Sequence, residues 1–194
     1  MGHRRDRPAT VQAPRESERA APGRPPTDRD DFAAFYRAEM PRLVALARGL
    51  CGAASADDVA QEAMLAAYRH WSRVRDLERP DAYVRRACAN LAVSAFRRRL
   101  VEVRALARLG QRREDPVALV DEAEEFWAHV RVLPPRQAQV VALHYVEDLS
   151  VADVAATLGC AEGTVKQHLS RARTALAAGL AGWRDPVGER EETA

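Results

Sequence analysis

The sequence has few aromatic residues and no alternating apolar pattern of the kind that marks a β-strand. Aromatic side chains make up 6% of the 194 residues, although hydrophobic residues as a whole make up 47%. β-branched residues never alternate with polar ones, whereas alanine is abundant throughout. Because alanine favours helices and alternation indicates strands, these features predict an all-α fold and argue against an all-β one.

Cysteine is also scarce, and the three that are present do not suggest a metal site. Cys51, Cys88 and Cys160 lie far apart, form no C-x-x-C pair and have no histidine at ligand spacing. This spacing argues against structural zinc and predicts small buried apolar residues. The chain further lacks a phosphate-cradling glycine-rich loop and a nucleophile with a matching histidine and carboxylate. We therefore expect no metal, no cofactor and no enzymatic activity.

Long hydrophobic runs are missing as well. The longest stretches without a charged residue, such as residues 87–96 and 174–183, are about half of the roughly 20 residues that cross a bilayer. The N-terminus carries charges, but no apolar segment follows them as it would in a secretory signal. We expect a cytoplasmic protein without membrane insertion.

Charge is balanced overall but segregated along the chain. The formal net charge is +2. Residues 79–113 carry ten arginines against two acids, whereas residues 114–127 carry six acids and no base. The basic segment includes three consecutive arginines, Arg97, Arg98 and Arg99, whose dense positive charge suits phosphate oxygens. The alternative is a helix face that is merely solvated. The acidic segment either holds the neighbouring chain off DNA or contacts the basic one.

Hydrophobic periodicity divides the chain into two predicted helical units. Residues 1–29 hold five prolines without periodicity, which predicts a disordered tail. A first unit over residues 30–100 follows, and residues 101–118 lose the pattern, which predicts a flexible linker. A second unit is predicted over residues 119–182, with a polar tail over 183–194. The helices expected in the first unit cover residues 31–50 (with Pro41 allowing a kink or restart), 57–74, 79–90 and 91–99.

Local sequence signals predict where several helices begin and end. Residues 55–58 (SADD) have the pattern of a capping box that opens the second helix, and Pro80 stands at the first helical position of the third. In the second unit, helical spacing begins near Leu119 and ends at the Pro-Pro pair of residues 134–135. A further helix is predicted over residues 137–146.

Residues 150–176 carry a helix-turn-helix pattern. Ser150 and Asp153 form a second capping box, and Gly159 closes the short helix that follows as its C-cap. The next helix has an apolar stripe, and its opposite face presents polar and basic side chains that suit base edges and phosphates of a major groove. The stripe consists of Val165, Leu169, Ala172 and Leu176, and the opposite face and its flanks consist of Lys166, Gln167, Ser170, Arg171, Arg173 and Thr174. His168 on the other flank contacts phosphate or stays solvated.

The same residues carry a family resemblance. Residues 133–176, LPPRQAQVVALHYVEDLSVADVAATLGCAEGTVKQHLSRARTAL, resemble region 4 of bacterial sigma factors of the extracytoplasmic-function (ECF) group of the sigma-70 family. Residues 30–71 resemble region 2 of that group, and so does the segment RPDAYVRRACANLAVSAFRRR of residues 79–99. The resemblance implies an RNA polymerase sigma factor with two small helical domains, a region 2 bundle and a region 4 helix-turn-helix.

The resemblance also assigns DNA-binding residues. Region 4 of the family reads the minus-35 element as duplex, and region 2 captures the minus-10 element as separated single strand. An amide can pair with the edge of an extruded base, and an arginine track can follow the backbone. The implied minus-35 residues are Thr164, Lys166, Gln167, Ser170, Arg171 and Arg173, and the implied minus-10 residues are Asn90, Arg97, Arg98 and Arg99. Asn90 is also suited to cap a helix beginning at residue 91.

Three positions depart from the family pattern. Ala161 stands where many relatives have a capping Ser or Pro, and His168 and Ala138 stand where relatives often have Arg. We therefore expect a lower minus-35 affinity or a different hexamer.

The resemblance implies a protein-binding face on the predicted helix 57–74. Asp58, Gln61, Glu62 and Leu65 share one side of this helix, where the family docks on the β′ clamp helices of core RNA polymerase. Asp58 and Glu62, at i, i+4, repel each other beside an exposed leucine, and a basic partner would relieve that repulsion. The alternative is a helix face that is merely solvated. The other implied partners are the polymerase β flap, promoter DNA and an anti-sigma factor.

A rival hypothesis is a stand-alone helix-turn-helix regulator that binds duplex DNA as a symmetric dimer and ignores polymerase. Such a regulator would need neither the Asp58/Glu62 face for polymerase binding nor Asn90 for capture of a single strand.

Overall fold

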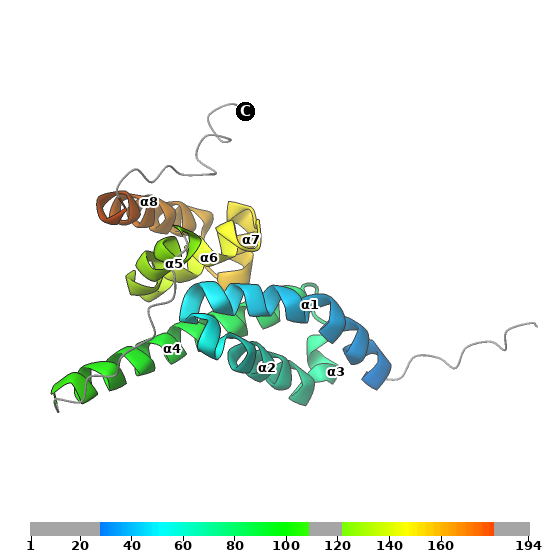
Figure 1. Ribbon diagram of the computed structural model, residues 1–194. Helices are drawn as coiled ribbons and strands as arrows, with labels where there is room; N and C mark the ends of the chain where they lie inside the picture. The colour runs from blue at the N-terminus through cyan, green and yellow to red at the C-terminus, as the bar shows by residue number, and fades with distance from the viewer. Residues whose placement is uncertain (1–27, 109–121, 181–194) are drawn as a thin grey trace, which may run out of the picture.

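The computed structural model describes residues 28–108 and 122–180, which form eight helices and no strand. The helices are α1 (Asp28–Cys51), α2 (Ala53–Arg69), α3 (Trp71–Val74), α4 (Pro80–Arg108), α5 (Glu122–Val132), α6 (Pro135–Tyr145), α7 (Val151–Leu158) and α8 (Glu162–Gly179). Figure 1 shows α1–α4, the first helical group, lying beneath α5–α8, the second helical group. The predicted all-α fold is confirmed. The described residues leave out nearly all of both predicted tails and the C-terminal part of the predicted linker.

An apolar core holds α1, α2 and α4 together. Leu43 and Leu46 of α1 and Val84 of α4 are fully buried, and each such side chain contributes about 1.5–3 kcal/mol by leaving water. Four fully buried alanines of α2 let its backbone approach its neighbours closely: Ala56, Ala60, Ala63 and Ala67. Among the described helices, none has the combination of length and apolar composition that a bilayer crossing requires.

The predicted capping box at residues 55–58 is wrong. Helix α2 already begins at Ala53, and Ser55 lies inside its first turn. The residue before the helix is Gly52, whose φ of 84° belongs to the left-handed region that glycine enters without strain. A sharp turn at this glycine, rather than a side-chain cap, therefore separates α1 from α2. The predicted helix 57–74 is also divided, because α2 ends at Arg69 and α3 follows.

Helix α4 is longer than the sequence pattern indicated. It begins at Pro80, as predicted, but continues without a break through residue 91 to Arg108. The expected break and the capping role of Asn90 are therefore wrong, and residues 101–108 of the predicted linker are helical. The physical reason is local, since neither glycine nor a second proline interrupts a run rich in alanine, leucine and arginine. Likewise, Pro41 lies inside α1 without causing a restart.

The helix-turn-helix forms as predicted. The Ser150 hydroxyl accepts a hydrogen bond from the backbone N–H of Asp153 at 3.1 Å, which caps α7. Gly159 ends α7 with a φ of 67°. The Pro-Pro pair separates α5 from α6, with Pro134 as the N-cap of α6. At the start of α8, Ala161 provides no side-chain cap, so one orphan N–H of that helix is left without the usual hydroxyl acceptor.

Thiol reactivity tests the burial of the core cysteines. Burial raises the pKa of Cys51 to about 11 and that of Cys88 to about 12. Cys160 is exposed, so the burial predicted for all three cysteines is wrong for this one. Because the thiolate is the reactive form, we expect a disulfide reagent at pH 8 to modify one thiol per native chain rapidly and the other two only after unfolding in guanidinium. A Cys160→Ser variant should lose the rapid phase, and rapid reaction of a second thiol would contradict the packing.

A hydroxyl cap added to α8 should stabilise the protein. Residue 161 already has the extended backbone of an N-cap, with φ −74° and ψ 148°. We expect Ala161→Ser to raise the free energy of unfolding in urea by about 0.5–2 kcal/mol. The same substitution at exposed Ala178, near the end of the helix, should bring no increase, and equal effects at the two positions would argue against the cap.

Candidate nucleic-acid and protein-binding sites

Helix α8 has a buried side and an exposed polar side. Val165 and Ala172 are fully buried, and Leu169 and Leu176 are nearly so, which confirms the predicted stripe. The side chains predicted to face DNA are exposed at Thr164, Lys166, Gln167, Ser170, Arg171 and Thr174. Within the described part of the chain, no acidic side chain forms an ion pair with Lys166 or Arg171. These two cations are therefore available to an anionic partner such as a DNA phosphate.

Two residues on the flanks of α8 are less available than the sequence suggested. Arg173 is half-buried, and its Nε donates a hydrogen bond to the Tyr145 hydroxyl of α6 at 3.4 Å. His168 is also half-buried, and its Nδ1 is buried without a hydrogen-bond partner among the described residues. The structure thus turns Nδ1 of His168 inward, and a contact of its remaining exposed atoms with phosphate or solvent stays a prediction.

The predicted minus-10 residues lie on α4. Asn90 and Arg97 are exposed and stand two helical turns apart, so they project from nearly the same face, about 10 Å apart along the axis. Arg98 and Arg99 are exposed beside them. The structure therefore places an amide and a short arginine track on one helix. The Asn90 Oδ1 also accepts a hydrogen bond from the Gln139 side chain of α6 at 2.8 Å, which the sequence did not predict.

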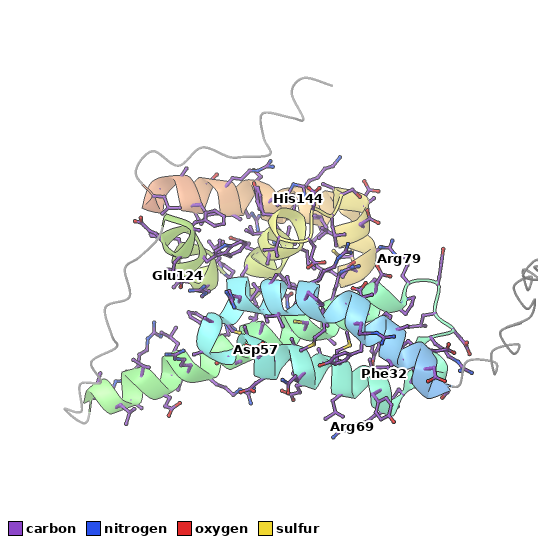
Figure 2. The ribbon with its side chains drawn as sticks, turned by 45° about the vertical axis from the view of Figure 1, so that its right-hand side comes forward. Phe32, Asp57, Arg69, Arg79, Glu124 and His144 are labelled. Atoms are coloured by element: carbon purple, nitrogen blue, oxygen red, sulfur yellow. The ribbon has the colours of Figure 1, made fainter. Side chains whose placement is uncertain are left out.

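A groove between α1 and α2 brings together the four predicted polymerase-binding residues. Its volume is about 810 Å³, and we refer to it as the docking groove. It is lined by Phe32, Ala33, Tyr36 and Arg37 of α1 and by Asp58, Gln61, Glu62, Met64, Leu65 and Tyr68 of α2. Figure 2 shows Phe32 and Arg69 at the same end of the α1–α2 pair, on the side of the molecule away from α8.

The aromatic residues of the docking groove, Phe32, Tyr36 and Tyr68, were not among the site residues predicted from the sequence. Phe32 packs against Tyr68 with ring centroids 4.8 Å apart, yet Tyr68 remains 50% exposed and Leu65 45% exposed. The available signal was the i, i+4 spacing of Phe32 and Tyr36. Exposed apolar side chains beside Asp58 and Glu62 form a surface that fits an amphipathic helix with basic residues.

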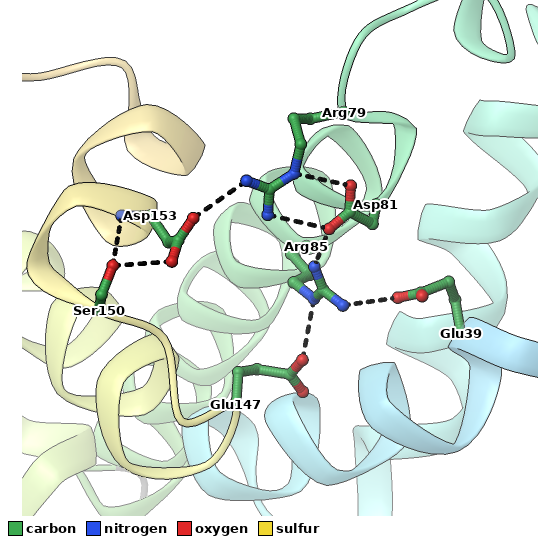
Figure 3. Close-up of polar contacts among 7 residues, drawn as sticks. All are labelled: Glu39, Arg79, Asp81, Arg85, Glu147, Ser150 and Asp153. Carbon is green, nitrogen blue, oxygen red and sulfur yellow. Dashed lines mark hydrogen bonds and ion pairs between the residues drawn. The ribbon is translucent and has the colours of Figure 1, made fainter.

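A buried arginine joins the two helical groups, and sequence analysis did not identify it. Arg85 of α4 is 3% exposed, and its guanidinium contacts three carboxylates (Figure 3). Nε donates to Glu147 at 2.8 Å, Nη2 donates to Glu39 at 3.0 Å, and Nη1 donates to Asp81. The only local signal was the i, i+4 spacing of Asp81 and Arg85, because the other two acids lie far away in the sequence.

A second arginine extends this network. Arg79 contacts both oxygens of Asp81 at 3.2 Å and donates to Asp153 of α7 at 3.0 Å. Burial alone would raise the pKa of Asp81, but the hydrogen bonds from Arg79 and Arg85 outweigh it and hold this pKa at about 2. Hydrogen bonds from Ser150 and Arg79 likewise lower the pKa of Asp153. Asp81 and Asp153 therefore remain charged near neutral pH.

Comparison with known proteins identifies both helical groups. The profile described as Sigma-70 region 2 matches residues 35–100, and that described as Sigma-70, region 4 matches residues 123–176. The RNA polymerase sigma-E factor of Streptomyces avermitilis is 32% identical over 154 residues, which cover 75% of this chain and 83% of the relative. The ECF RNA polymerase sigma factor EcfG of Rhodopseudomonas palustris is 34% identical over 155 residues, with coverage of 77% and 83%.

Solved structures agree with this relationship. The sigma factor RpoE of Bartonella quintana, solved in complex with the anti-sigma factor NepR, superposes with a TM-score of 0.58 at 27% identity, over 79% of this chain and 99% of that one. CnrH, solved with the cytosolic domain of CnrY, has the same fold, with a TM-score of 0.55 at 22% identity over 77% of this chain and 87% of that one. With both sigma regions in order and curated relatives above 30% identity along most of their length, the chain belongs to the ECF group of RNA polymerase sigma factors.

Proposed function

We propose that this protein directs core RNA polymerase to specific promoters, with α8 reading the minus-35 element as duplex and α4 capturing the minus-10 element as single strand. The observation that carries the proposal is the pairing of an exposed polar and basic face on α8 with an exposed amide and arginine track on α4 in one chain. A stand-alone regulator would need only the first of these. The polymerase supplies the catalysis, and this chain acts as a non-enzymatic specificity subunit. Its proposed place of action is the cytoplasm.

On the minus-35 side, each residue is assigned the role that its chemistry and exposure allow. Arg171, Gln167 and Ser170 lie on the central exposed face and are suited to base edges. Lys166 and Thr164 lie towards the start of the helix and are suited to phosphate, where the helix dipole also favours negative charge. The contribution of Arg173 is smaller, because it is held by Tyr145.

The docking groove is the proposed contact with core polymerase. Its acidic residues suit a basic helix, and its exposed leucine and tyrosine suit the apolar side of the same helix. By the family resemblance, that helix belongs to the β′ clamp, and region 4 contacts the β flap. The relative RpoE was solved with an anti-sigma factor. An anti-sigma protein is therefore a further proposed partner.

Charge reversal in the docking groove tests the polymerase contact. We expect Asp58→Arg combined with Glu62→Arg to weaken binding to core RNA polymerase by about 100-fold, because like charges across an interface cost several kcal/mol. Affinity would be measured with labelled protein and purified core enzyme. Asp57→Arg is the matched control, since Asp57 is exposed on the same helix but does not line the groove. If the double variant binds as the wild type does, the contact lies elsewhere.

Replacement of Arg171 tests base recognition by α8. In reconstituted transcription with core polymerase, we expect Arg171→Ala to cost about 1–3 kcal/mol on the preferred minus-35 sequence and to relax the preference at one position. Lys166→Ala should instead weaken all sequences alike and reduce the salt dependence. The preferred sequence would come from sequencing the DNA retained by the polymerase complex.

The same experiment separates the proposal from its rival. Selection of tight DNA sites by the purified chain alone, as a symmetric dimer and without polymerase, would favour the stand-alone regulator.

A further inference from the structure

The C-terminal part of α4 extends beyond the rest of the first helical group. Figure 1 shows this part of the helix, residues 97–108, running past the ends of α1 and α2. Its side chains are exposed except those of Leu100 and Leu106, which are half-buried. Even the apolar Val101 is 66% exposed. Packing within the chain therefore leaves most of this surface open to a partner.

Basic residues dominate this exposed segment. Five of its twelve residues are arginines, and Glu102 is its single acid. Among the described residues, none of the five arginines has a partner in an ion pair or a side-chain hydrogen bond. The five are Arg97, Arg98, Arg99, Arg104 and Arg108. The segment is thus a strongly positive helix surface.

Three of these arginines continue the line of Asn90 along the helix. Arg97 and Arg104 follow Asn90 at steps of seven residues, and Arg108 follows four residues later. At about 100° per residue, the four side chains lie within a sector of about 40°. The line is about 27 Å long, at about 1.5 Å per residue. We refer to Arg97, Arg104 and Arg108 as the arginine stripe.

The arginine stripe differs from a helix face that is merely solvated. Such a face commonly alternates charges of both signs, because acids and bases at i, i+3 or i, i+4 stabilise a helix. No acid stands at these spacings from any residue of the stripe, and Arg104 and Arg108 repel each other at i, i+4. The negative end of the helix favours a cation at Arg108 but acts too locally to account for Arg97. A polyanion would relieve this repulsion along the whole line.

The chemistry of the stripe suits duplex DNA better than a single strand. Surfaces that bind single strands combine basic side chains with aromatic ones on which the bases stack. Residues 97–108 contain no aromatic residue, so they offer contacts to the backbone alone. Duplex DNA carries one charge per about 1.7 Å of its axis, twice the density of one strand. Guanidinium groups pair well with its phosphate oxygens.

The stripe also reaches beyond the residues that the family comparison covers. The region 2 profile ends at residue 100, so Arg104 and Arg108 lie outside it. The distance from Asn90 to Arg108 equals about eight base pairs of duplex at about 3.4 Å each. A helix that lies along the DNA, with Asn90 at the separated strand, therefore places its last arginines several base pairs away.

We propose that Arg104 and Arg108 bind phosphates of the duplex that flanks the captured minus-10 segment, with Arg97 between the two sites. This placement rests on the proposed function, because it assumes that Asn90 holds the separated strand. Duplex binding by the stripe does not depend on that assumption. The stripe supplies affinity without sequence preference, since phosphates carry no direct sequence information.

Salt dependence tests duplex binding by the stripe without polymerase. The full-length chain is titrated with a DNA duplex of random sequence at several salt concentrations. Each phosphate contact contributes about 0.9 to the slope of log affinity against log salt concentration. We expect Arg104→Ala combined with Arg108→Ala to lower the magnitude of this slope by about 1.8 and to weaken binding about tenfold at about 0.1 M salt.

An exchange variant separates the position of the charges from their number. It combines Arg104→Ala with Ala105→Arg and Arg108→Ala with Ala107→Arg, so composition and net charge stay the same. Both alanines are exposed, and each arginine moves by about 100° around the helix, out of the line. We expect the salt slope of this variant to lie closer to that of the double alanine variant than to that of the wild type.

Opened promoter DNA bound by the complex with core polymerase tests the placement. Two fragments carry the same separated minus-10 segment. One keeps about ten base pairs of duplex on each side, beyond the reach of Arg108, and the other keeps about two. We expect the double alanine variant to bind about tenfold more weakly than the wild type on the first fragment and equally well on the second.

Each result decides a separate part of the proposal. An unchanged slope in the double alanine variant, or a wild-type slope in the exchange variant, would overturn duplex binding by the stripe. Equal losses on both promoter fragments, or no loss on either, would overturn the placement. If Asn90→Ala leaves binding of the opened promoter unchanged, the proposed minus-10 capture fails, and the slopes of the chain alone still decide the role of the stripe.

Discussion

A guanidinium group can leave water only if its donors find acceptors, and Arg85 meets this requirement with three carboxylates from three parts of the chain. Two of them fix α1 and α4 within the first helical group. The third, Glu147, ties the loop after α6 to that group. The relative placement of the helical groups depends on this last pair, because a carboxylate buried at 3% exposure without its arginine would be strongly unfavourable.

The packing of the two helical groups also determines how the surfaces are distributed. A hydrogen bond from Gln139 of α6 to Asn90 joins this face of α4 to the second helical group, while the arginines that follow Asn90 remain exposed. The docking groove lies away from this contact, between α1 and α2, and the packing of the two helical groups leaves it uncovered.

Much of the architecture could be predicted because its causes are local. The apolar stripe of α8, the Ser150 cap, the Gly159 C-cap and the start of α4 at Pro80 all follow from neighbouring residues. The errors arose where a local signal competed with another. The SADD segment resembled a cap, but Gly52 turned the chain three residues earlier, and Asn90 suggested a boundary inside a helix that its strong formers kept continuous.

The sequence by itself determined the helices, the helix-turn-helix, the family and the residues that form the polar face of α8, since helical periodicity and capping depend on residues three or four positions apart. Only the tertiary structure decided that Phe32 joins Leu65 in one groove, that Gln139 donates a hydrogen bond to Asn90 and that Glu147 meets Arg85. Partners 33, 49 and 62 positions apart leave no periodic trace in a single sequence, because their proximity results from the packing of whole helices.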